Sequence, residues 1–409
     1  MSDLTQYQRD HLFLLVGENP LPNYVAADLL AKDGATVYLL HSGGTHGTAT
    51  VAERLEHAIK RRRPGLKPVR REIDEAHPAR ICRQLEEVLA GIKSASVGLN
   101  YTGGTKAMAV HAYQTIREKF PTVVSSYLDA RTLSLMIDEP GPNLIPVRES
   151  CKLDLRELLG LHGATIVRSQ NGCLLDHNGD HGIDFRALVG ALLQLCAGTD
   201  GDEWQQWCQE NLKKEAARRF KSKTDLAMVP FPDSYPTVRA ALGDPITLGD
   251  TTLPPGWKLD DLAEFLDGKW LEHYVLYSLK KVAAGCHVHD PAMGLQMSSS
   301  ARRKFEFDIA AMRGYQLFAI SCTTESQRGW CKLKLFEAYV RARQLGGDEA
   351  QVSLVCCHDD ASALQQEIEE DWFTEGRIRV FGRRDLRELA GQLKDWFETL
   401  DSGEWAGRP

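Results

Sequence analysis

The sequence predicts an α/β fold with two domains joined by a connecting segment, and three patterns support this. In residues 1–150, short apolar runs alternate with helical patterns at intervals of roughly 25 to 30 residues, which is typical of βαβ units and a parallel, Rossmann-like sheet. The pattern loosens over 151–258, which is expected to be a mainly helical connecting segment. Regular strand and helix patterns resume at Leu259, so a second α/β domain is expected over 259–409.

The first domain is expected to contain a series of parallel strands followed by a hairpin. The strands are expected at 11–16, 35–41, 69–73, 96–99 and 123–128, and the hairpin partner at 133–137. Ligands of such sheets bind in the loops at the carboxyl ends of the strands. Three of these loops are rich in Gly, Asn, Ser and Thr but lack Gly-x-Gly-x-x-Gly, which disfavours a nicotinamide or flavin dinucleotide.

The turn after the strand at 96–99 carries the most informative chemistry of this domain. It reads Asn-Tyr-Thr-Gly-Gly-Thr-Lys over 100–106, and a helix is expected to begin at Thr105 or Lys106. The N–H groups and the dipole of a helix start favour anions, and Gly103 and Gly104 allow a ligand to approach the main chain closely. Lys106 adds a positive charge where the dipole opposes it, which indicates an anion nearby. We interpret this turn as a phosphate-binding corner.

Two other interpretations of this turn stay open. A nucleoside-triphosphate P-loop, Gly-x-x-x-x-Gly-Lys-Ser/Thr, matches the spacing from Gly98 to Gly103, but Gly104 stands where the lysine is needed. The turn also fits a plain strand-to-helix connection, in which Asn and Gly serve only as turn residues.

Composition indicates a cytoplasmic, multidomain protein with no membrane contact. Of 409 residues 43% are hydrophobic, yet no apolar run approaches the roughly 18 residues that cross a membrane, and no signal peptide is expected. Ten cysteines are scattered without a Cys-x-x-Cys pair, which favours free thiols. A net charge of −7 excludes non-specific coating of nucleic acid, so any such contact must be local. Basic clusters suited to local contacts occur at 213–223 and 302–304.

A second group of chemically active residues lies in the C-terminal domain. Glu272 sits beside the apolar stripe of a helix that starts near Gly268. Residues 304–310 and 317–320 are expected to form a hairpin with Asp308 on its first strand and a polar tip at 321–325 after its second. This is the layout of PD-(D/E)xK nucleases, in which carboxylates hold Mg²⁺ or Mn²⁺ and a lysine orients or deprotonates the attacking water. The alternative is an ordinary α/β domain whose acids are solvated.

Taken together, these residues resemble those of the CARF-domain PD-(D/E)xK ancillary nucleases of type III CRISPR systems. The N-terminal part resembles a CARF domain, a Rossmann fold that senses cyclic oligoadenylates, and the C-terminal part resembles the restriction-endonuclease-like module fused to it. The matching stretches are Gly17 with 19–23, 100–108, 268–272, 307–308 with 320–322, and 334–337 with 346–347. They cover both ends of the chain and leave the middle unassigned.

The resemblance implies a homodimer in which two CARF domains bind one cyclic oligoadenylate on the two-fold axis. The expected activator is cyclic tetra-adenylate, with cyclic hexa-adenylate as the alternative ring size. The residues implied to bind it are Gly17, Asn19, Pro20, Ser42, Gly43, Thr45, Asn100, Thr102, Gly103, Gly104, Thr105 and Lys106. Activation would be a population shift, which requires the ligand to bind the nuclease-competent arrangement more tightly.

The resemblance also implies a metal-dependent endonuclease site that cuts DNA or RNA. Its candidate catalytic residues are Glu272, Asp308, Ser321, Glu325, Lys332 and Lys334, and the candidate ligands of Mg²⁺ or Mn²⁺ are Glu272, Asp308 and Cys322. The chain departs from the family pattern where the reactive lysine belongs, because Thr323 stands there. In one interpretation Lys332 or Lys334, on the next helix, takes the role of that lysine, and Glu325 replaces the missing carboxylate. In the other, cleavage is impaired.

Three functions therefore stay open. The first is a cyclic-oligoadenylate-activated nuclease, and the second is a cyclic-oligoadenylate-sensing regulator with an impaired nuclease domain. The third is a metabolic α/β enzyme that uses Cys356, Cys357 or His358, against which stands the simpler interpretation of these cysteines as buried thiols.

Overall fold

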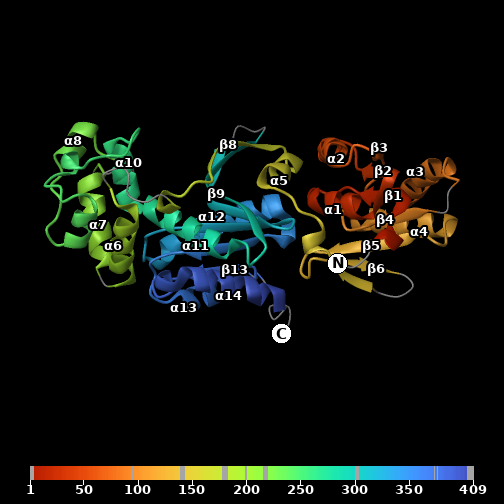
Figure 1. Ribbon diagram of the computed structural model, residues 1–409. Helices are drawn as coiled ribbons and strands as arrows, with labels where there is room; N and C mark the ends of the chain where they lie inside the picture. Colours follow the sequence, from red (N-terminus) through yellow and green to blue (C-terminus); the bar gives the residue numbers. More distant parts are fainter. Residues whose placement is uncertain are drawn as a thin grey trace.

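The computed structural model describes residues 4–93, 96–138, 143–176, 183–198, 200–214, 220–299, 304–372, 374 and 376–402. Two β-sheets with helices on both faces lie side by side, and a helical lobe extends beyond the second sheet (Figure 1). The chain builds the first sheet, continues through the lobe, and returns to complete the second sheet. The expected α/β class is confirmed, with two separate sheets.

The first sheet has seven strands in the order β3-β2-β1-β4-β5-β6-β7. They are β1 (Arg9–Leu15), β2 (Ala31–His41), β3 (Lys67–Glu72), β4 (Val97–Asn100), β5 (Val124–Asp129), β6 (Ser134–Ile137) and β7 (Asn143–Pro146). Pairs among β1 to β5 are parallel, whereas β6 and β7 extend the sheet antiparallel. The strands expected from the sequence are present within a few residues of their expected bounds, and β7 is an addition.

Helices cover both faces of this sheet. α1 (Leu21–Leu30) and α2 (Ala49–Arg62) pack on one face, and α3 (Pro78–Ala90) and α4 (Lys106–Lys119) pack on the other. Along β1, Leu12 and Leu14 join the core of the first face, while Phe13 and Leu15 join that of the second. All four side chains are buried, as in a strand covered on both sides.

The second sheet has six strands in the order β13-β12-β11-β10-β9-β8. They are β8 (Ala164–Gln170), β9 (Val288–Ser299), β10 (Lys304–Arg313), β11 (Gln316–Cys322), β12 (Gln351–Val355) and β13 (Ile378–Phe381). β10 and β11 form the expected hairpin, and Gly314 makes its turn with a φ of +62°. β8 belongs to the segment 151–258, so that segment supplies a strand as well as helices.

Helices also cover both faces of the second sheet. α12 (Arg328–Gly346) and α13 (Ala361–Trp372) share the core of one face, and α11 (Trp270–Ala283) and α14 (Leu389–Ser402) share that of the other. The helical lobe adjoins the α11 face and consists of α6 (Phe185–Ala197), α7 (Gly201–Leu212), α8 (Lys223–Ala227), α9 (Pro236–Ala241) and α10 (Leu259–Glu264). A π-helical turn, η5 (Phe265–Lys269), leads from α10 into α11.

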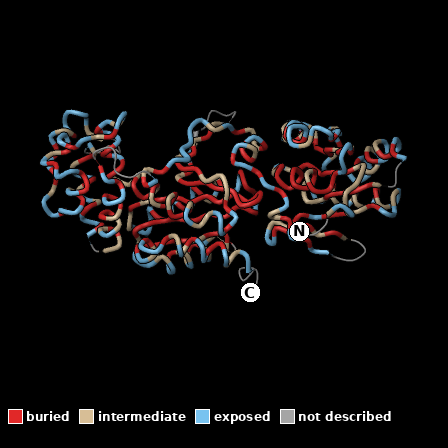
Figure 2. The backbone as a smooth tube through the Cα atoms, in the orientation of Figure 1, coloured by how far each residue is buried: buried red, intermediate tan, exposed pale blue. Residues whose placement is uncertain are grey.

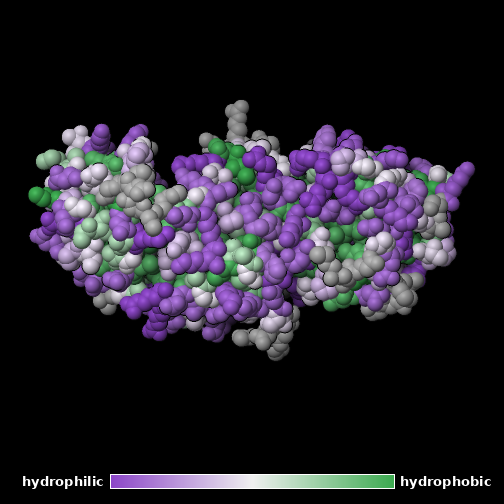
Figure 3. All heavy atoms as spheres, viewed as in Figure 1, coloured by the Kyte–Doolittle hydropathy of each residue, from purple (hydrophilic) through white to green (hydrophobic). Residues whose placement is uncertain are grey.

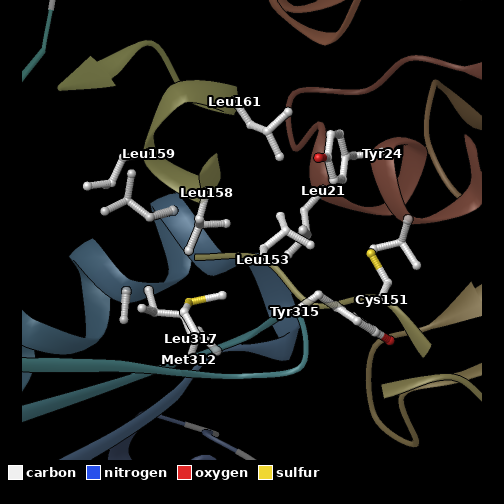
Figure 4. Packing of buried hydrophobic residues seen from close by; sticks show 14 of the residues in the cluster. Leu21, Tyr24, Cys151, Leu153, Leu158, Leu159, Leu161, Met312, Tyr315 and Leu317 are labelled. Carbon is white, nitrogen blue, oxygen red and sulfur yellow. The ribbon is translucent and has the colours of Figure 1, made fainter. Parts of the chain in front are cut away.

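A continuous hydrophobic core joins the two sheets. Leu153 and α5 (Leu155–Leu161) lie between α1 and the β10–β11 hairpin, where Leu161 points toward Tyr24 and Tyr315 belongs to the same cluster (Figure 4). Figure 2 shows the same band of buried residues running from one sheet into the other. Because each large apolar side chain buried there contributes about 2 kcal/mol, pulling the two domains apart would be costly.

A glycine turn of the second domain touches the first domain directly. Gly347, which begins η6 (Gly347–Glu349), has a φ of +66°, and a Cβ there would overlap Nδ2 of Asn19. The neighbouring Glu349 is 2% exposed. Burial raises the pKa of Glu349 to about 7, although Arg377 and Arg343 pull it down. A buried acid therefore lies at the contact between the domains.

Replacing Glu349 with Gln should remove part of the pH dependence of stability. The unfolded chain ionises Glu349 above pH 4.5, but the folded chain holds the proton until about pH 7, so the wild type loses stability as pH rises between these values. Between pH 5 and pH 8, E349Q should gain about 2 kcal/mol relative to the wild type in urea unfolding. Identical pH profiles would contradict the buried acid, and Glu398→Gln on the exposed side of α14 is the control.

Surface features agree with the composition. None of the described helices is long and apolar enough to span a membrane, and hydrophilic residues dominate the face drawn in Figure 3. The ten cysteines are free, as expected, and all but Cys82 are buried. Of the expected basic clusters, 215–219 and 301–303 lie outside the described residues.

Candidate functional site

The first candidate site is a cradle made by three loops, 17–20, 42–45 and 101–106, at the carboxyl ends of β1, β2 and β4. A Cβ at Gly17 would lie 3.2 Å from the main-chain N of Gly104, so the first and third loops meet. A Cβ at Gly103 would overlap the carbonyl oxygen of Leu15, which leaves room for glycine alone. The structure therefore brings the expected glycines together in one place.

The start of α4 has the geometry that the sequence predicts for an anion corner. The helix begins at Lys106, and Thr105 caps it by accepting a hydrogen bond on Oγ1 from the N–H of Met108 at 3.1 Å. The same hydroxyl donates to the carbonyl oxygen of Glu75 at 2.6 Å. Gly104, Thr105 and Lys106 are exposed, so the N–H groups and the ammonium group of this turn are accessible to a ligand.

Several other residues expected to bind the ligand form hydrogen bonds within the protein that hold the cradle loops in place. The Asn100 side chain is fully buried; it donates to Oγ of Ser126 at 3.1 Å and accepts from the N–H of Thr102 at 3.3 Å. Thr102 Oγ1 accepts from the N–H of Leu128 at 2.8 Å, and Ser42 Oγ accepts from the N–H of Thr48 at 3.2 Å. These three side chains therefore already have hydrogen-bond partners within the protein.

The remaining cradle residues divide between exposed and packed positions. Thr45 is exposed, whereas Pro20 is buried and Gly43 lies against the carboxylate of Glu72. Asn19 Oδ1 accepts a hydrogen bond from the N–H of Leu21, the first residue of α1, at 3.0 Å, and its amide nitrogen faces Gly347 of the second domain. A residue expected to sense the ligand thus touches the domain expected to cleave.

The second candidate site is built around Glu272 on α11. Its Oε2 lies 2.7 Å from Nζ of Lys269, the last residue of η5, and the same ammonium lies 3.8 Å from Oε1 of Glu306 on β10. Burial raises the pKa of Glu272 to about 8, the nearby Asp308 adds to this, and Lys269 opposes it. Burial lowers the pKa of Lys269, but the facing carboxylates outweigh this effect and place it above its usual value.

Asp308 reaches the same place from the β10–β11 hairpin. The antiparallel pairing of Ile309 with Ile320 sets Asp308 beside Ser321. Asp308 Oδ2 accepts two hydrogen bonds, from Oγ of Ser321 at 3.0 Å and from the N–H of Cys322 at 2.7 Å. These bonds fix the carboxylate, and Oδ1 is the oxygen left for a ligand. The sequence-based association of Glu272, Asp308 and Ser321 agrees with this geometry.

Glu272 lines a cleft of about 1120 Å³ between the helical lobe and the second sheet, whereas Asp308 and Ser321 line a smaller cavity next to it. Its lining includes Lys269 and Glu272, the end of β11 from Cys322 to Gln327, and parts of α7 and α12. Lys334 and Glu337 of α12 also line a smaller cavity of about 40 Å³ beside Asp308.

The other expected catalytic residues differ in position. Glu325 and Lys334 line the cleft. Lys332 does not: it points to α13, where it pairs with Glu367 and lies 3.2 Å from Oδ2 of Asp371. Of the two lysines proposed as replacements, Lys334 alone is therefore placed to act in the cleft.

The residues present fit a hard cation only in part. Glu272 and Asp308 provide carboxylate oxygens, the donors that Mg²⁺ and Mn²⁺ prefer. Within the described ranges, however, no three His, Cys, Asp or Glu side chains converge closely enough to hold a metal. The Cys322 thiol is buried, and burial followed by Asp308 raises its pKa well above the usual value. Cys322 can therefore contribute to metal binding only through its main chain.

Lys269 and Glu306 are the site residues that the sequence-based prediction omits. Glu306 shares a face of β10 with Asp308, so strand periodicity was the available signal. Lys269 lies in the stretch 268–272 that resembles the family, but its direction depends on η5, which sequence patterns do not reveal.

The cysteine cluster at the end of β12 carries no comparable site. Cys356 and Cys357 are buried, and the pKa of each thiol is raised well above its usual value, mainly by a neighbouring thiol and by burial. His358 Nδ1 lies 2.7 Å from the carbonyl oxygen of Ser326. These residues behave as core thiols and a loop contact.

Comparisons with known proteins agree with this architecture. Residues 260–400 match the family model of the Card1-like endonuclease domain. The chain is similar in structure to protein VC1899 from Vibrio cholerae, with 19% sequence identity, 95% of this chain and 98% of that chain covered, and a TM-score of 0.65. It is also similar to Can2 from Sulfobacillus thermosulfidooxidans in complex with cyclic tetra-adenylate, with 15% identity, 95% and 99% coverage, and a TM-score of 0.71. None of the curated proteins matches this sequence.

The C-terminal part of the chain is thus similar to a Card1-like endonuclease domain, and the chain shares its fold with VC1899 and Can2. The nuclease part of the resemblance inferred from the sequence agrees with the family match over 260–400.

Proposed function

We propose that this chain, with its Card1-like endonuclease domain, is an ancillary nuclease of a type III CRISPR system that a cyclic oligoadenylate activates. The observation that carries this proposal is the closeness of two acids, Glu272 from α11 and Asp308 from β10, whose charges interact. Glu272 lines the cleft, and Asp308 lines the small neighbouring cavity that shares Lys334 and Glu337 with it. Two carboxylates at that position suit a divalent cation, Mg²⁺ or Mn²⁺, which would polarise the scissile phosphate when bound. The protein holds Asp308 in position through Ser321 and the main chain of Cys322.

The cradle is proposed to bind cyclic tetra-adenylate across a homodimer. The exposed start of α4 offers N–H groups and the Lys106 ammonium, and a two-fold axis would double them to match a ring with about four negative charges. The structure of Can2, which shares this fold, contains cyclic tetra-adenylate. Cyclic hexa-adenylate is the alternative ring size that a titration must include.

Helix α12 provides a physical link between the two sites. Its first half lines the cleft through Trp330, Leu333 and Lys334, and its end reaches the Gly347 turn that contacts Asn19. Nineteen residues of α-helix span about 28 Å, so one rigid element connects cradle and cleft. A ligand that moves the loop at Asn19 would therefore act on the cleft through α12.

The cleft walls suit a nucleic-acid strand. α7 contributes Gln205, Gln206 and Gln209, and Lys213 and Lys214 follow. On the other wall Trp330 is 41% exposed, which provides a surface for stacking a base.

Replacing Lys213 and Lys214 with Gln should weaken retention of nucleic acid about tenfold without changing activator affinity. Two fewer ammonium groups would contact phosphates, so the slope of log affinity against log salt should fall by about 1 to 2. Fluorescence anisotropy with labelled strands at several salt concentrations measures both. The double variant Lys280→Gln, Lys281→Gln on α11 is the control, and an unchanged salt slope would show that this wall does not bind phosphates.

The proposal is tested by incubating the protein with Mn²⁺, cyclic tetra-adenylate or cyclic hexa-adenylate, and single-stranded DNA, supercoiled DNA or RNA. Cleavage that depends on one of the rings is expected. Absence of cleavage with every ring and every substrate would refute the nuclease function.

A second function is favoured by one observation, the Thr323 that stands in place of the motif lysine. In this alternative the chain is a regulator that binds cyclic oligoadenylate, and its nuclease domain is catalytically impaired. Cleavage that occurs only after Thr323→Lys, and never in the wild type, would favour the regulator.

A further inference from the structure

Although Thr323 stands where the reactive lysine belongs, a lysine from a different element lines the same cleft. Residues 267–269 pack against the end of β11: Thr324 Oγ1 donates to the carbonyl oxygen of Asp267 at 3.2 Å, and a Cβ at Gly268 would lie 3.5 Å from that hydroxyl. Lys269 and Thr323 both line the cleft. Lys269 therefore belongs to the segment that packs against the end of β11, and it lines the same cleft as Thr323.

Lys269 is better placed than the other candidate lysines. Its Nζ lies 2.7 Å from Oε2 of Glu272, and its side chain is 23% exposed. Lys334 is exposed on the rim, and Lys332 pairs with acids of α13 away from the cleft. Among the lysines that the structure describes, Lys269 alone forms an ion pair with one of the two carboxylates assigned to the cation.

The local backbone also sets Lys269 apart. It ends the π-helical turn η5, immediately before α11 begins at Trp270. Such turns are rare and are often found at functional sites, because they shift a side chain relative to a regular α-helix. Lysine has a long flexible stem and a compact charge, so its ammonium can move from Glu272 to a phosphate that arrives beside it.

We propose that Lys269 is the catalytic lysine of this nuclease, in place of the lysine that is absent at 323; this rests on the proposed nuclease function. Its ammonium donates hydrogen bonds to the scissile phosphate and to the attacking water, which stabilises the charge that develops on the phosphate. In the step, the water oxygen forms a bond to phosphorus and the bond from phosphorus to the leaving oxygen breaks. The water loses a proton to solvent, the leaving oxygen takes one from solvent, and Lys269 keeps its own proton.

A purely structural role for Lys269 makes the opposite prediction for metal binding. If Lys269 only holds Glu272 in position, its removal should weaken Mn²⁺ binding. If it acts on the phosphate, its removal frees Glu272 from a competing cation, so Mn²⁺ binding should stay the same or become tighter. Calorimetric titration of Mn²⁺ without substrate separates these roles independently of cleavage.

The experiment compares the wild type with Lys269→Met, which keeps the apolar stem, and with the control Lys280→Met. Lys280 lies on α11, the helix that follows Lys269, and forms a similar ion pair, 2.8 Å from Oδ2 of Asp176, outside the cleft. K269M should lower kcat about 100-fold or more with little change in KM and unweakened Mn²⁺ binding, whereas K280M should behave as the wild type.

A second variant tests whether the two positions are equivalent. Adding Thr323→Lys to K269M should raise the cleavage rate at least tenfold above that of K269M alone. Three outcomes would each overturn the inference but leave the nuclease function standing. They are a cleavage rate of K269M within about threefold of the wild type, weaker Mn²⁺ binding by K269M, and no recovery of cleavage in the double variant. Absence of cleavage in the wild type with every activator would overturn the nuclease function, and the inference with it.

Discussion

Asp308→Asn is expected to lower activator-dependent cleavage about 10³-fold while leaving the fold unchanged. The asparagine oxygen can still accept the hydrogen bonds from Ser321 Oγ and the N–H of Cys322, so the hairpin keeps its geometry. The negative charge is lost, and with it the electrostatic attraction for a divalent cation beside the scissile phosphate. The measurement is the single-turnover cleavage rate at saturating activator and Mn²⁺.

Two controls make this result specific. Asp371→Asn removes an acid that pairs with Lys332 outside the cleft, so its cleavage rate should match that of the wild type. Calorimetry should show unchanged binding of the cyclic oligoadenylate to D308N, because the cradle lies in the other domain. Full cleavage by D308N would mean that Asp308 holds no cation and that the site lies elsewhere.

Lys106→Ala is expected to weaken binding of cyclic tetra-adenylate about 100-fold. A hydrogen bond to a charged group contributes about 1.5 kcal/mol or more, and each homodimer would lose two of them. The loss should come from direct contact, because Lys106 is exposed and Thr105, not Lys106, caps α4. Isothermal titration measures the affinity and the number of rings per chain.

Lys119→Ala is the matched control, since Lys119 is an exposed lysine in the last turn of the same helix. It should bind the ring as the wild type does. For K106A, cleavage should return when the ring is raised far above its new dissociation constant, since the nuclease site is intact. If K106A bound cyclic tetra-adenylate as tightly as the wild type, the phosphate-binding corner would not be part of the ligand site.

Sequence patterns predicted the first domain well because its physical signals are local. The parallel strands other than β3 contain a short apolar run bounded by turn residues, and the start of α4 is marked by Thr105 directly before Lys106. The glycines of the cradle were also readable, because Gly103 must accommodate the carbonyl oxygen of Leu15. The sequence could not predict which cradle side chains are available to a ligand, because Asn100 and Ser42 form hydrogen bonds with residues distant in the sequence or on other segments.

The second domain was predicted in part. Alternation along β10 and the apolar return strand identified the hairpin and put Asp308 beside Ser321. β8 and β9 were missed because long-range pairing, rather than local propensity, makes them strands of this sheet. Lys269 was missed as a site residue for a similar reason, since a π-helical turn rather than a residue spacing sets its direction.

The contact between the two domains has no sequence signature. Gly347 was part of the family resemblance, but nothing in the order of residues indicated that it would lie against Asn19. Contacts between distant segments depend on how α5 and its leucines pack between the sheets, which follows from three-dimensional packing.

The decisive measurement is the rate of nucleic-acid cleavage by the wild type as cyclic tetra-adenylate is titrated in the presence of Mn²⁺. The proposed coupling through α12 predicts negligible cleavage without the ring and saturation at one ring per two chains. Cleavage that proceeds equally without any ring, with tight binding of the ring retained, would contradict control of the cleft by the cradle.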